Sequence, residues 1–382
     1  MKYVHKIQRH ISIIANEVWH CEFLCPHLFM PFTIEYFTSK EANDNMHKLP
    51  STIKLFRMHS AIPITFAFIF AFISNVQPKE NVVMVPNETH YDPRKCGVSL
   101  NVHKPYQLKI MGGTDVEMGE HPWTVAIYLK SFYCCVGTLI SNKHVITAAH
   151  CFFKDVKPTL KLCGPKHAIT EEEALENVKV MYGSKCLKPS NVSSCFNVLP
   201  MKTMAIVRAQ YGRFFRQRCC GGDIALLELE HEIDEKDANY ICLANRILLS
   251  ENEKFYTIQA VGWGSNPTVK RIFMNNLQKL EFHRLIDRDK CKQIYGKLLS
   301  NDILCTEEAY SRNVCLGDSG GGLMAQLHDG RWLLLGISSY GTSCKKLADK
   351  AAQPLVQVYT DIRMYSGEID KFTGYFLPWE QV

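Results

Sequence analysis

The stretch NVCLGDSGGGLM, from Asn313 to Met324, places an aspartate, a serine and four glycines directly after a cysteine. A flexible linker can have this composition, and so can the strained turn that presents a nucleophilic serine. The two interpretations differ in what the rest of the chain must supply. A nucleophilic serine needs a base, an acid that orients the base, and a rigid frame that holds the three groups together.

The composition limits the class of protein. The chain has 382 residues, of which 46% are hydrophobic, enough for the core of one large domain or of two smaller ones. Its formal net charge of +6 is spread out, and the sequence has no Lys/Arg-rich block with interleaved aromatics, which argues against a nucleic-acid partner. The 16 cysteines favour an oxidising, secretory compartment. Glycosylation sequons at Asn87 and Asn191 agree with that compartment.

The long apolar run of the sequence is AIPITFAFIFAFI, from Ala61 to Ile73. It is shorter than the roughly 20 residues that a membrane-spanning helix needs, and it suits the hydrophobic region of a secretory signal. A start at Met46 or Met58 would give a signal of ordinary length, and Ser74 is a candidate for its last residue. We therefore expect residues 1–74 to be an upstream extension and a signal peptide. A short type II membrane anchor is the alternative.

The composition of the sequence changes twice after this run. Residues 75–109 are polar, contain several prolines and Cys96, and are predicted to be an extended propeptide without its own core. From Ile110 onward, short runs rich in β-branched and aromatic residues recur between turn residues, as in WTVAIYL, HVITAA and YTIQAVGW. This pattern predicts an antiparallel all-β protein, with helices near Asp287–Tyr295 and Asp361–Phe372.

Three short segments carry candidate reactive side chains. TAAHC contains His150, GGDIALLEL contains Asp223 at the start of an apolar strand, and GDSGG contains Ser319 in a glycine-rich turn. Taken singly, each has an ordinary explanation as a surface or core histidine, a turn aspartate or a loop serine. Together they meet the needs of serine attack, in which a histidine takes the hydroxyl proton and a carboxylate fixes the imidazole tautomer.

In this order, TAAHC, DIALL and GDSGG resemble the trypsin/chymotrypsin-like serine proteases. The resemblance includes IMGG, HPW, GWG and VYT and covers the chain from about Cys96 to Phe372. Within the family, the chain is more loosely similar to a divergent, nematode-like branch. It implies two antiparallel six-stranded β-barrels packed together, followed by a C-terminal helix. The implied protease domain is 110–372, with a first barrel at about 110–240, a second at about 241–360, the helix at about 361–372 and a tail at 373–382.

The resemblance also implies roles for individual residues. His150 would be the general base, Asp223 the carboxylate that orients it, and Ser319 the nucleophile that forms an acyl-enzyme. The backbone amides of Gly317 and Ser319 would form the oxyanion hole. Ser339 would hydrogen-bond the buried aspartate.

An activation site is implied at Lys109–Ile110, in front of the residues MGG. Cleavage there would create an ammonium group at Ile110, which in this family pairs with the aspartate before the nucleophile, here Asp318. Because a buried carboxylate without its partner is costly, the uncut chain is expected to be a zymogen with a misplaced oxyanion loop. The lysine implies a trypsin-like activating protease, or self-cleavage.

The resemblance implies four disulfides: Cys96–Cys242, Cys135–Cys151, Cys291–Cys305 and Cys315–Cys344. A further bridge of the family would join positions that hold Ile258 and Ala325 here, so both of its ends are missing. Sequence leaves open how the remaining cysteines of the body pair, namely Cys134, Cys163, Cys186, Cys195, Cys219 and Cys220. Loop disulfides are favoured over a zinc site for them, and no cofactor or metal is expected.

The primary specificity pocket departs from the family pattern. Asn313 stands where trypsin-like enzymes carry an aspartate, so strong preference for basic side chains should be lost. Gln357 occupies a wall position that is usually glycine and would shorten the pocket, whereas Gly341 keeps the small residue at the entrance. With Ser339 and with Tyr340 in place of a common tryptophan, these residues predict a polar, neutral and shallow pocket. The sequence does not indicate which substrate side chain this pocket prefers.

The predicted function is a secreted serine endopeptidase made as a zymogen. The alternative is a silent relative that acts as a binding or regulatory protein, which only the unusual pocket favours because all three reactive residues are present. Expected partners are a protein or peptide substrate, an activating protease and protein inhibitors. A membrane is expected only if residues 61–73 stay uncleaved.

Overall fold

The computed structural model describes residues 94–100, 113–153, 168–190, 195–211, 221–243, 255, 257–269, 273–295 and 300–374. The predicted signal at 61–73, both sequons and the cleavage site at Lys109–Ile110 lie outside these residues, so those predictions stay predictions. None of the helices in the described ranges has both the length and the hydropathy that crossing a bilayer requires.

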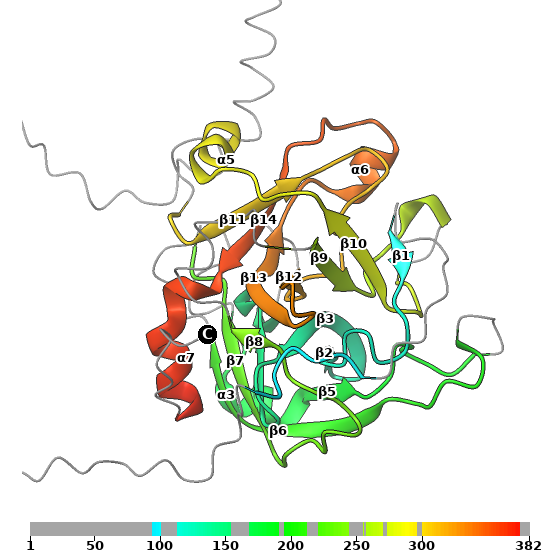
Figure 1. Cartoon of the computed structure of the whole chain (residues 1–382), viewed down its shortest axis with the longest axis vertical. Helices are drawn as coiled ribbons and strands as arrows, with labels where there is room; N and C mark the ends of the chain where they lie inside the picture. The colour runs from blue at the N-terminus through cyan, green and yellow to red at the C-terminus, as the bar shows by residue number, and fades with distance from the viewer. Residues whose placement is uncertain are drawn as a thin grey trace, which may run out of the picture. The chain divides into compact units, whose positions relative to one another are not determined.

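Six strands close into an antiparallel barrel in the order β2-β3-β4-β7-β6-β5 (Figure 1). They are β2 (Thr124–Leu129), β3 (Phe132–Leu139), β4 (His144–Thr147), β5 (Val178–Tyr182), β6 (Lys202–Tyr211) and β7 (Ala225–Leu229). In the hairpin of β2 and β3, Leu129 pairs with Phe132 across Lys130 and Ser131. Both turn residues have positive φ angles, 50° and 69°, as a type I′ turn requires. Such a turn matches the right-handed twist of its strands, which helps the sheet to close.

The second sheet has eight strands in the order β1-β10-β9-β12-β13-β14-β11, with β8 paired in parallel to β13. They are β1 (Thr114–Asp115), β8 (Cys242–Leu243), β9 (Thr257–Gly262), β10 (Gln278–Phe282), β11 (Ile303–Glu307), β12 (Gly322–Gln326), β13 (Trp332–Tyr340) and β14 (Val356–Asp361). The backbone N–H of Ile286, beyond the end of β10, donates to the carbonyl of Cys305 in β11 at 2.8 Å, so the two ends of the row that runs from β10 to β11 meet.

The predicted all-β class with two barrels is confirmed, with one correction to the second barrel. Six strands were expected there, and the sheet also contains β1 and β8. Each of these has only two residues, too few to show the alternation of apolar and polar residues that predicts a strand.

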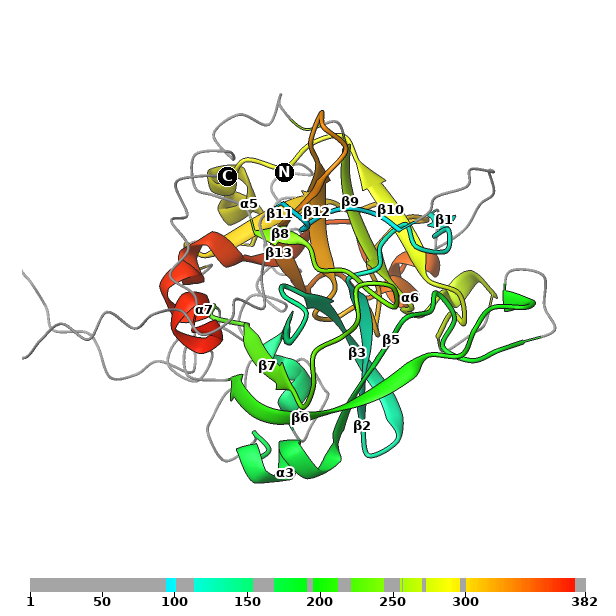
Figure 2. The ribbon, with the colours of Figure 1, turned by 60° about the horizontal axis from the view of Figure 1, so that its bottom comes forward.

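The two sheets share one continuous apolar core, which includes Trp123, Trp263 and Tyr359. Contacts between the sheets are also polar. Trp123 Nε1, at the start of the first barrel, donates to Met324 Sδ on β12 at 2.9 Å, and the N–H of Val136 on β3 donates to the carbonyl of Ser319 at 2.8 Å. Figure 2 shows β12 and β13 above the strands of the first barrel.

The predicted helices are present with shifted bounds: α5 spans Arg288–Tyr295, and the C-terminal segment consists of η9 (Ile362–Tyr365) and α7 (Ser366–Thr373). Although α7 follows the second sheet in sequence, it lies against the first barrel (Figure 1). Arg208 on β6 donates to the carbonyl of Phe372 at 2.5 Å and lies 4.1 Å from the centre of its ring. Further short helices are η2 (Ala149–Phe152), α3 (Glu171–Asn177), η8 (Pro267–Val269) and α6 (Cys344–Ala348).

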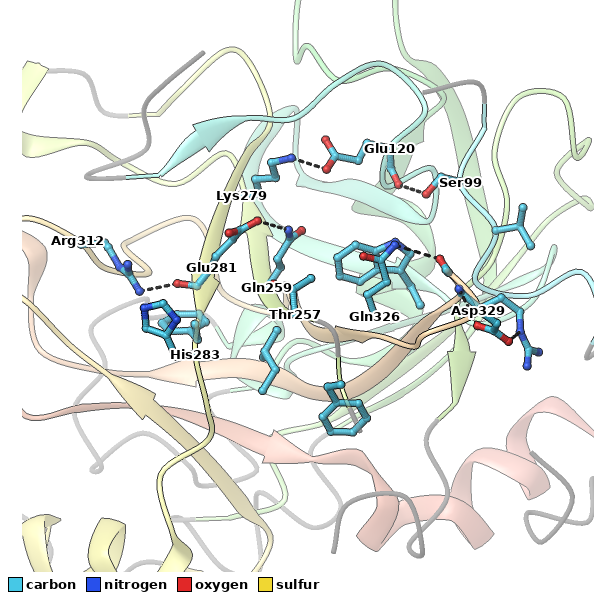
Figure 3. A pocket seen from close by; sticks show the side chains of 17 residues that line it. Ser99, Glu120, Thr257, Gln259, Lys279, Glu281, His283, Arg312, Gln326 and Asp329 are labelled. Atoms are coloured by element: carbon cyan, nitrogen blue, oxygen red, sulfur yellow. Dashed lines mark hydrogen bonds and ion pairs between the residues drawn. The ribbon is translucent and has the colours of Figure 1, made fainter. Parts of the chain in front are cut away.

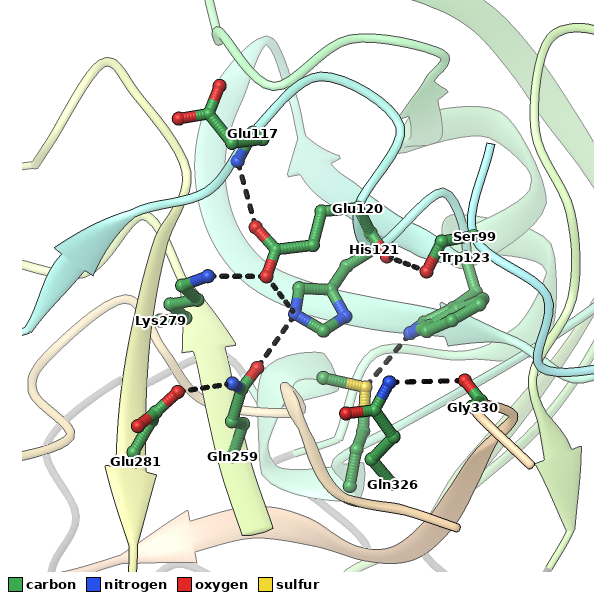
Figure 4. A network of polar contacts seen from close by, with 11 residues as sticks. Ser99, Glu117, Glu120, His121, Trp123, Gln259, Lys279, Glu281, Gln326 and Gly330 are labelled. Carbon is green, nitrogen blue, oxygen red and sulfur yellow. Dashed lines mark hydrogen bonds and ion pairs between the residues drawn. The ribbon is translucent and has the colours of Figure 1, made fainter. Parts of the chain in front are cut away.

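A buried polar network connects the segment before β2 with β9 and β10 (Figure 4). His121 Nε2 lies 2.9 Å from Gln259 Oε1, and Gln259 Nε2 donates to Glu281 Oε1 at 2.8 Å. The amide oxygen can only accept, so we assign the imidazole proton to Nε2. His121 Nδ1 has no hydrogen-bond partner among the described residues. A second proton on this ring would therefore be buried and unsatisfied, and burial lowers the pKa of His121 from 6.5 to about 4.

This pKa predicts a specific loss of stability in acid. Below about pH 6.5 the unfolded chain takes up a proton at His121 that the folded chain accepts only near pH 4, so folding becomes less favourable as the pH falls between these values. The effect is about 3 kcal/mol when complete, and it is absent at pH 7. His121→Gln, which keeps a donor for Gln259, should remove it. Urea unfolding of both proteins at pH 7 and pH 4 measures the difference, and a difference independent of pH would contradict the assignment.

Candidate active site

Asp223 is the buried carboxylate to which His150 and Ser339 are both hydrogen-bonded. It precedes β7, is 4% exposed, and accepts hydrogen bonds from His150 through the backbone N–H at 2.9 Å and through ring Nδ1 at 2.7 Å. The hydroxyl group of Ser339 on β13 donates to the same carboxylate. Thr360 on β14 donates to its backbone carbonyl at 2.9 Å. The first barrel and the second sheet therefore both fix the position of this side chain.

His150 lies on η2, directly after β4, and its side chain is 26% exposed. With Nδ1 donating to Asp223, ring Nε2 is left without a proton and can accept one. Burial opposes charging of the ring, but the charge and the hydrogen bond of Asp223 outweigh it, so the pKa of His150 is raised. For Asp223, burial favours the neutral acid, and the His150 and Ser339 contacts outweigh it, so its pKa is lowered.

Ser319 lies in a turn that is held against the first barrel. Its carbonyl accepts from Val136, and Gly320 donates to the carbonyl of Ser338 at 2.9 Å. Gly320 has a φ of +79°, and a Cβ there would lie 2.1 Å from Thr147 Oγ1 and 3.0 Å from the nitrogen of Ala148. Glycine is thus required by conformation and by space. The turn places Ser319, which is partly exposed, beside the residues that lead into His150. In the described structure, no hydrogen bond joins Ser319 to His150.

Asp318 points away from these groups into a closely fitted site. Its carboxylate accepts from the backbone N–H groups of Gly264 at 2.7 Å and Cys315 at 2.8 Å. The two glycines of GWG make the space for it, because a Cβ on Gly262 or Gly264 would lie 2.1 or 2.2 Å from a carboxylate oxygen. Burial raises the pKa of Asp318 to about 6, against the influence of these two hydrogen bonds. No cation pairs with it within the described part of the chain, and its predicted partner Ile110 lies outside that part.

The residues predicted to form the specificity pocket come from three places: Asn313 lies between β11 and β12, Ser339 and Tyr340 end β13 with Gly341 directly after them, and Gln357 lies on β14. Asn313 and Gln357 are buried, and Tyr340 is partly exposed with its ring centre 5.9 Å from that of Tyr295. A Cβ on Gly341 would lie 2.2 Å from Gln357 Oε1. The Gln357 side chain therefore reaches the entrance glycine and crosses the predicted pocket.

Sequence reasoning missed Glu308, which lies in no motif. The residue is 9% exposed, and its carboxylate accepts from the N–H groups of Thr342 at 2.6 Å and Leu355 at 2.8 Å. One of its oxygens would lie 2.6 Å from a Cβ on Gly341. Glu308 thus connects the segment after β13 to the segment before β14 and supports both sides of the predicted pocket.

The four disulfides implied by the resemblance are bonded in the structure, and a fifth joins Cys186 to Cys195. Ile258 and Ala325, the positions of the missing bridge, face each other between β9 and β12. Cys134 is a free thiol, while Cys163, Cys219 and Cys220 lie outside the described residues. Among the described residues one potential metal-binding group was found, Cys135, His150 and Cys151, and its two cysteines are bonded to each other, so they offer no thiolate.

A hollow of about 970 Å³ lies over β9, β10 and β12 and contains none of these site residues (Figure 3). Its charged side chains are balanced within the chain: Lys279 pairs with Glu120, and Arg331 with Asp329 at 2.8 Å. Arg312 donates to the carbonyl of Glu281. The size of the hollow therefore does not mark it as a reactive site.

Comparisons with known proteins agree with this geometry. The trypsin family model matches residues 110–366. The trypsin-like protease try-5 of Caenorhabditis elegans is 31% identical over 305 residues, covering 74% of this chain and 92% of that protein. Two proteins of Mus musculus are also similar: ovochymase-2, 27% identical over 70% of this chain and 42% of its own length, and transmembrane protease serine 11C, 29% identical over 73% and 56%.

The Asp223 contact predicts how His150 titrates. In a Ser319→Ala background, the imidazole should titrate above pH 6.5, because the Asp223 charge stabilises its protonated form. In the additional Asp223→Asn variant the same signal should titrate below pH 6.5, because only the opposing effect of burial remains. NMR titration of the histidine ring signals measures both values. An unchanged His150 signal would show that the carboxylate does not control this ring.

Proposed function

Because the chain belongs to the trypsin family of serine proteases, we propose that it is a secreted serine endopeptidase, made as a zymogen and activated by cleavage at Lys109–Ile110. The observation that carries the proposal is the His150–Asp223 pair, with ring Nδ1 2.7 Å from a buried carboxylate and Ser319 on an adjoining turn. A membrane-anchored form is the alternative location, and one mouse relative is named a transmembrane protease.

In the proposed reaction, Ser319 Oγ attacks the carbonyl carbon of the scissile peptide bond while His150 Nε2 takes the hydroxyl proton. Asp223 keeps the imidazole in the required tautomer and stabilises its protonated form. The amides of Gly317 and Ser319 donate to the developing oxyanion. His150 then gives its proton to the leaving amine, and water hydrolyses the acyl-enzyme by the reverse sequence of proton transfers.

Activation is proposed to act through Asp318. An ammonium group at Ile110 would pair with this carboxylate, which is otherwise buried with two backbone N–H donors. A cation at this position would lower the pKa of Asp318 from about 6 and remove the cost of burying its charge. Since Asp318 adjoins both Gly317 and Ser319, the new ion pair would stabilise the turn that carries the amide donors. The activating protease and any protein inhibitor remain proposed partners.

The proposed substrate residue before the scissile bond has a short, uncharged side chain. Asn313 supplies no charge to the pocket, and Gln357 crosses it as far as Gly341. Glu308 is a carboxylate, but both of its oxygens accept backbone N–H groups. The second candidate function is a silent relative that acts as a binding or regulatory protein, and the unusual pocket is the feature that raises it.

Activation can be tested by replacing residues 105–109 with an enteropeptidase sequence, so that cleavage leaves Ile110 as the first residue. The cut protein should react with a serine-directed fluorophosphonate, because the oxyanion donors are then in place, whereas the uncut protein should react at least about 100-fold more slowly. Gel fluorescence measures the labelling rate. Ser319→Ala is the matched control and should not be labelled. A cut, folded protein that stays unlabelled would favour the silent relative.

The pocket assignment predicts a change of specificity in Gln357→Gly. Removing this side chain opens space behind Gly341, so kcat/KM for substrates with phenylalanine or methionine before the scissile bond should rise about 10-fold or more relative to alanine substrates. Initial rates on matched peptide series measure the ratio. The fluorophosphonate labelling rate controls for an intact reactive centre. An unchanged ratio would show that Gln357 does not limit the pocket.

A further inference from the structure

The turn that precedes Ser319 receives one side-chain contact from the first barrel that the proposed mechanism has not used. Tyr133, on β3, donates from its hydroxyl group to the carbonyl oxygen of Gly317 at 2.5 Å. The two residues are 184 positions apart in sequence. Gly317 carries one of the two amides assigned to the oxyanion hole, so the contact reaches the residue whose orientation matters most for that role.

Tyr133 is held by a cluster of aromatic rings. Its ring meets those of Phe273, Trp263 and Tyr128 edge to face, with centres 4.9, 6.4 and 5.8 Å away. Phe273 also lies against Gly317, since a Cβ on Gly317 would be 2.7 Å from a carbon of its ring. Burial, with the nearby charge of Asp318, raises the pKa of Tyr133 well above its ordinary value. The phenol therefore stays protonated and remains a donor at any pH at which the protein would work.

Gly317 needs such outside contacts to hold one conformation. Its φ is +98°, and without a Cβ it has a wide choice of backbone angles. Fixing its carbonyl oxygen fixes the peptide plane that follows it and leaves fewer directions for its own N–H. The neighbouring carbonyl of Ser319 is bonded to Val136 of the same strand at 2.8 Å. Strand β3 thus holds both residues that supply the proposed amide donors.

We propose that Tyr133 is a positioning residue for the oxyanion hole: its hydroxyl group, by binding the Gly317 carbonyl, directs the Gly317 amide toward the developing oxyanion. It does not touch the substrate itself. The inference rests on the proposed protease function, because an amide that stabilises no oxyanion has no need of this orientation. Its effect should therefore appear in the transition state and not in the binding of the ground-state peptide.

The test uses the cut full chain, with Tyr133→Phe compared to Tyr128→Phe. Tyr133→Phe removes one oxygen and keeps the ring in the cluster. Tyr128→Phe removes a hydroxyl group from the same cluster that does not bond Gly317 in the described structure. For Tyr133→Phe we expect kcat to fall about 10-fold with KM nearly unchanged. The inhibition constant of a peptide boronate, whose tetrahedral adduct places an oxygen in the oxyanion hole, should rise by the same factor.

Tyr128→Phe should leave kcat and the boronate constant within about two-fold of the wild type. Equal falls in both variants, or a loss in Tyr133→Phe that appears only in KM or in the melting temperature, would overturn the positioning role and show a merely structural one. Labelling of the wild type by the fluorophosphonate separates this failure from that of the proposed function. A labelled wild type with a fully active Tyr133→Phe overturns the inference alone, and an unlabelled, folded wild type overturns both.

Discussion

The buried carboxylate of Asp223 is the contact on which the candidate site depends, because it receives donors from both sheets. His150 approaches it from the end of β4 with a backbone and a ring N–H, and Ser339 approaches from β13. Burial alone would favour the neutral acid, and these donors keep the pKa lowered. The ionised state of Asp223 therefore depends on how the two sheets pack against each other. If the sheets moved apart, the carboxylate would lose the donor that Ser339 supplies from β13.

The glycines of the sequence motifs follow from the same packing. Around Ser319 the turn is pressed against β3 and β4, and Gly320 leaves no room for a Cβ beside Thr147. Around Asp318 the constraint comes from Gly264, which lies so close to a carboxylate oxygen of Asp318 that no larger residue would fit. The motifs GDSGG and GWG, whose glycines could suggest flexible segments in the sequence, are closely packed in the structure.

Much of the fold was predictable because it rests on local patterns. Short β-branched runs predicted several strands of each sheet, such as β2, β4 and β9, and family motifs implied which histidine, aspartate and serine belong together. The α3 helix was also within reach, since Thr170 and Glu173 form a capping box whose sequence pattern was overlooked. The contact of Tyr133 with Gly317 and the hydrogen bonds of Glu308 could not be predicted from the sequence. Each joins residues distant in sequence, 184 and up to 47 positions apart, and neither a tyrosine in a strand nor a glutamate in a loop has a pattern that names its partner.

Apart from Ser339, which donates to Asp223, the residues that would choose a substrate make no hydrogen bond to His150, Asp223 or Ser319 in the described structure. His150, Asp223 and the Ser319 turn are held by backbone hydrogen bonds, including one from β3, and by the side chains of Ser339 on β13 and Thr360 on β14. The predicted pocket is shaped by Asn313 and Gln357, and Glu308 and the Cys315–Cys344 disulfide connect the segment after β11 with the segments that flank α6. A substitution at Gln357 can therefore reshape the pocket without displacing the triad. An unusual pocket beside the predicted residues His150, Asp223 and Ser319 is what a change of specificity would produce, and it does not by itself argue for loss of chemistry.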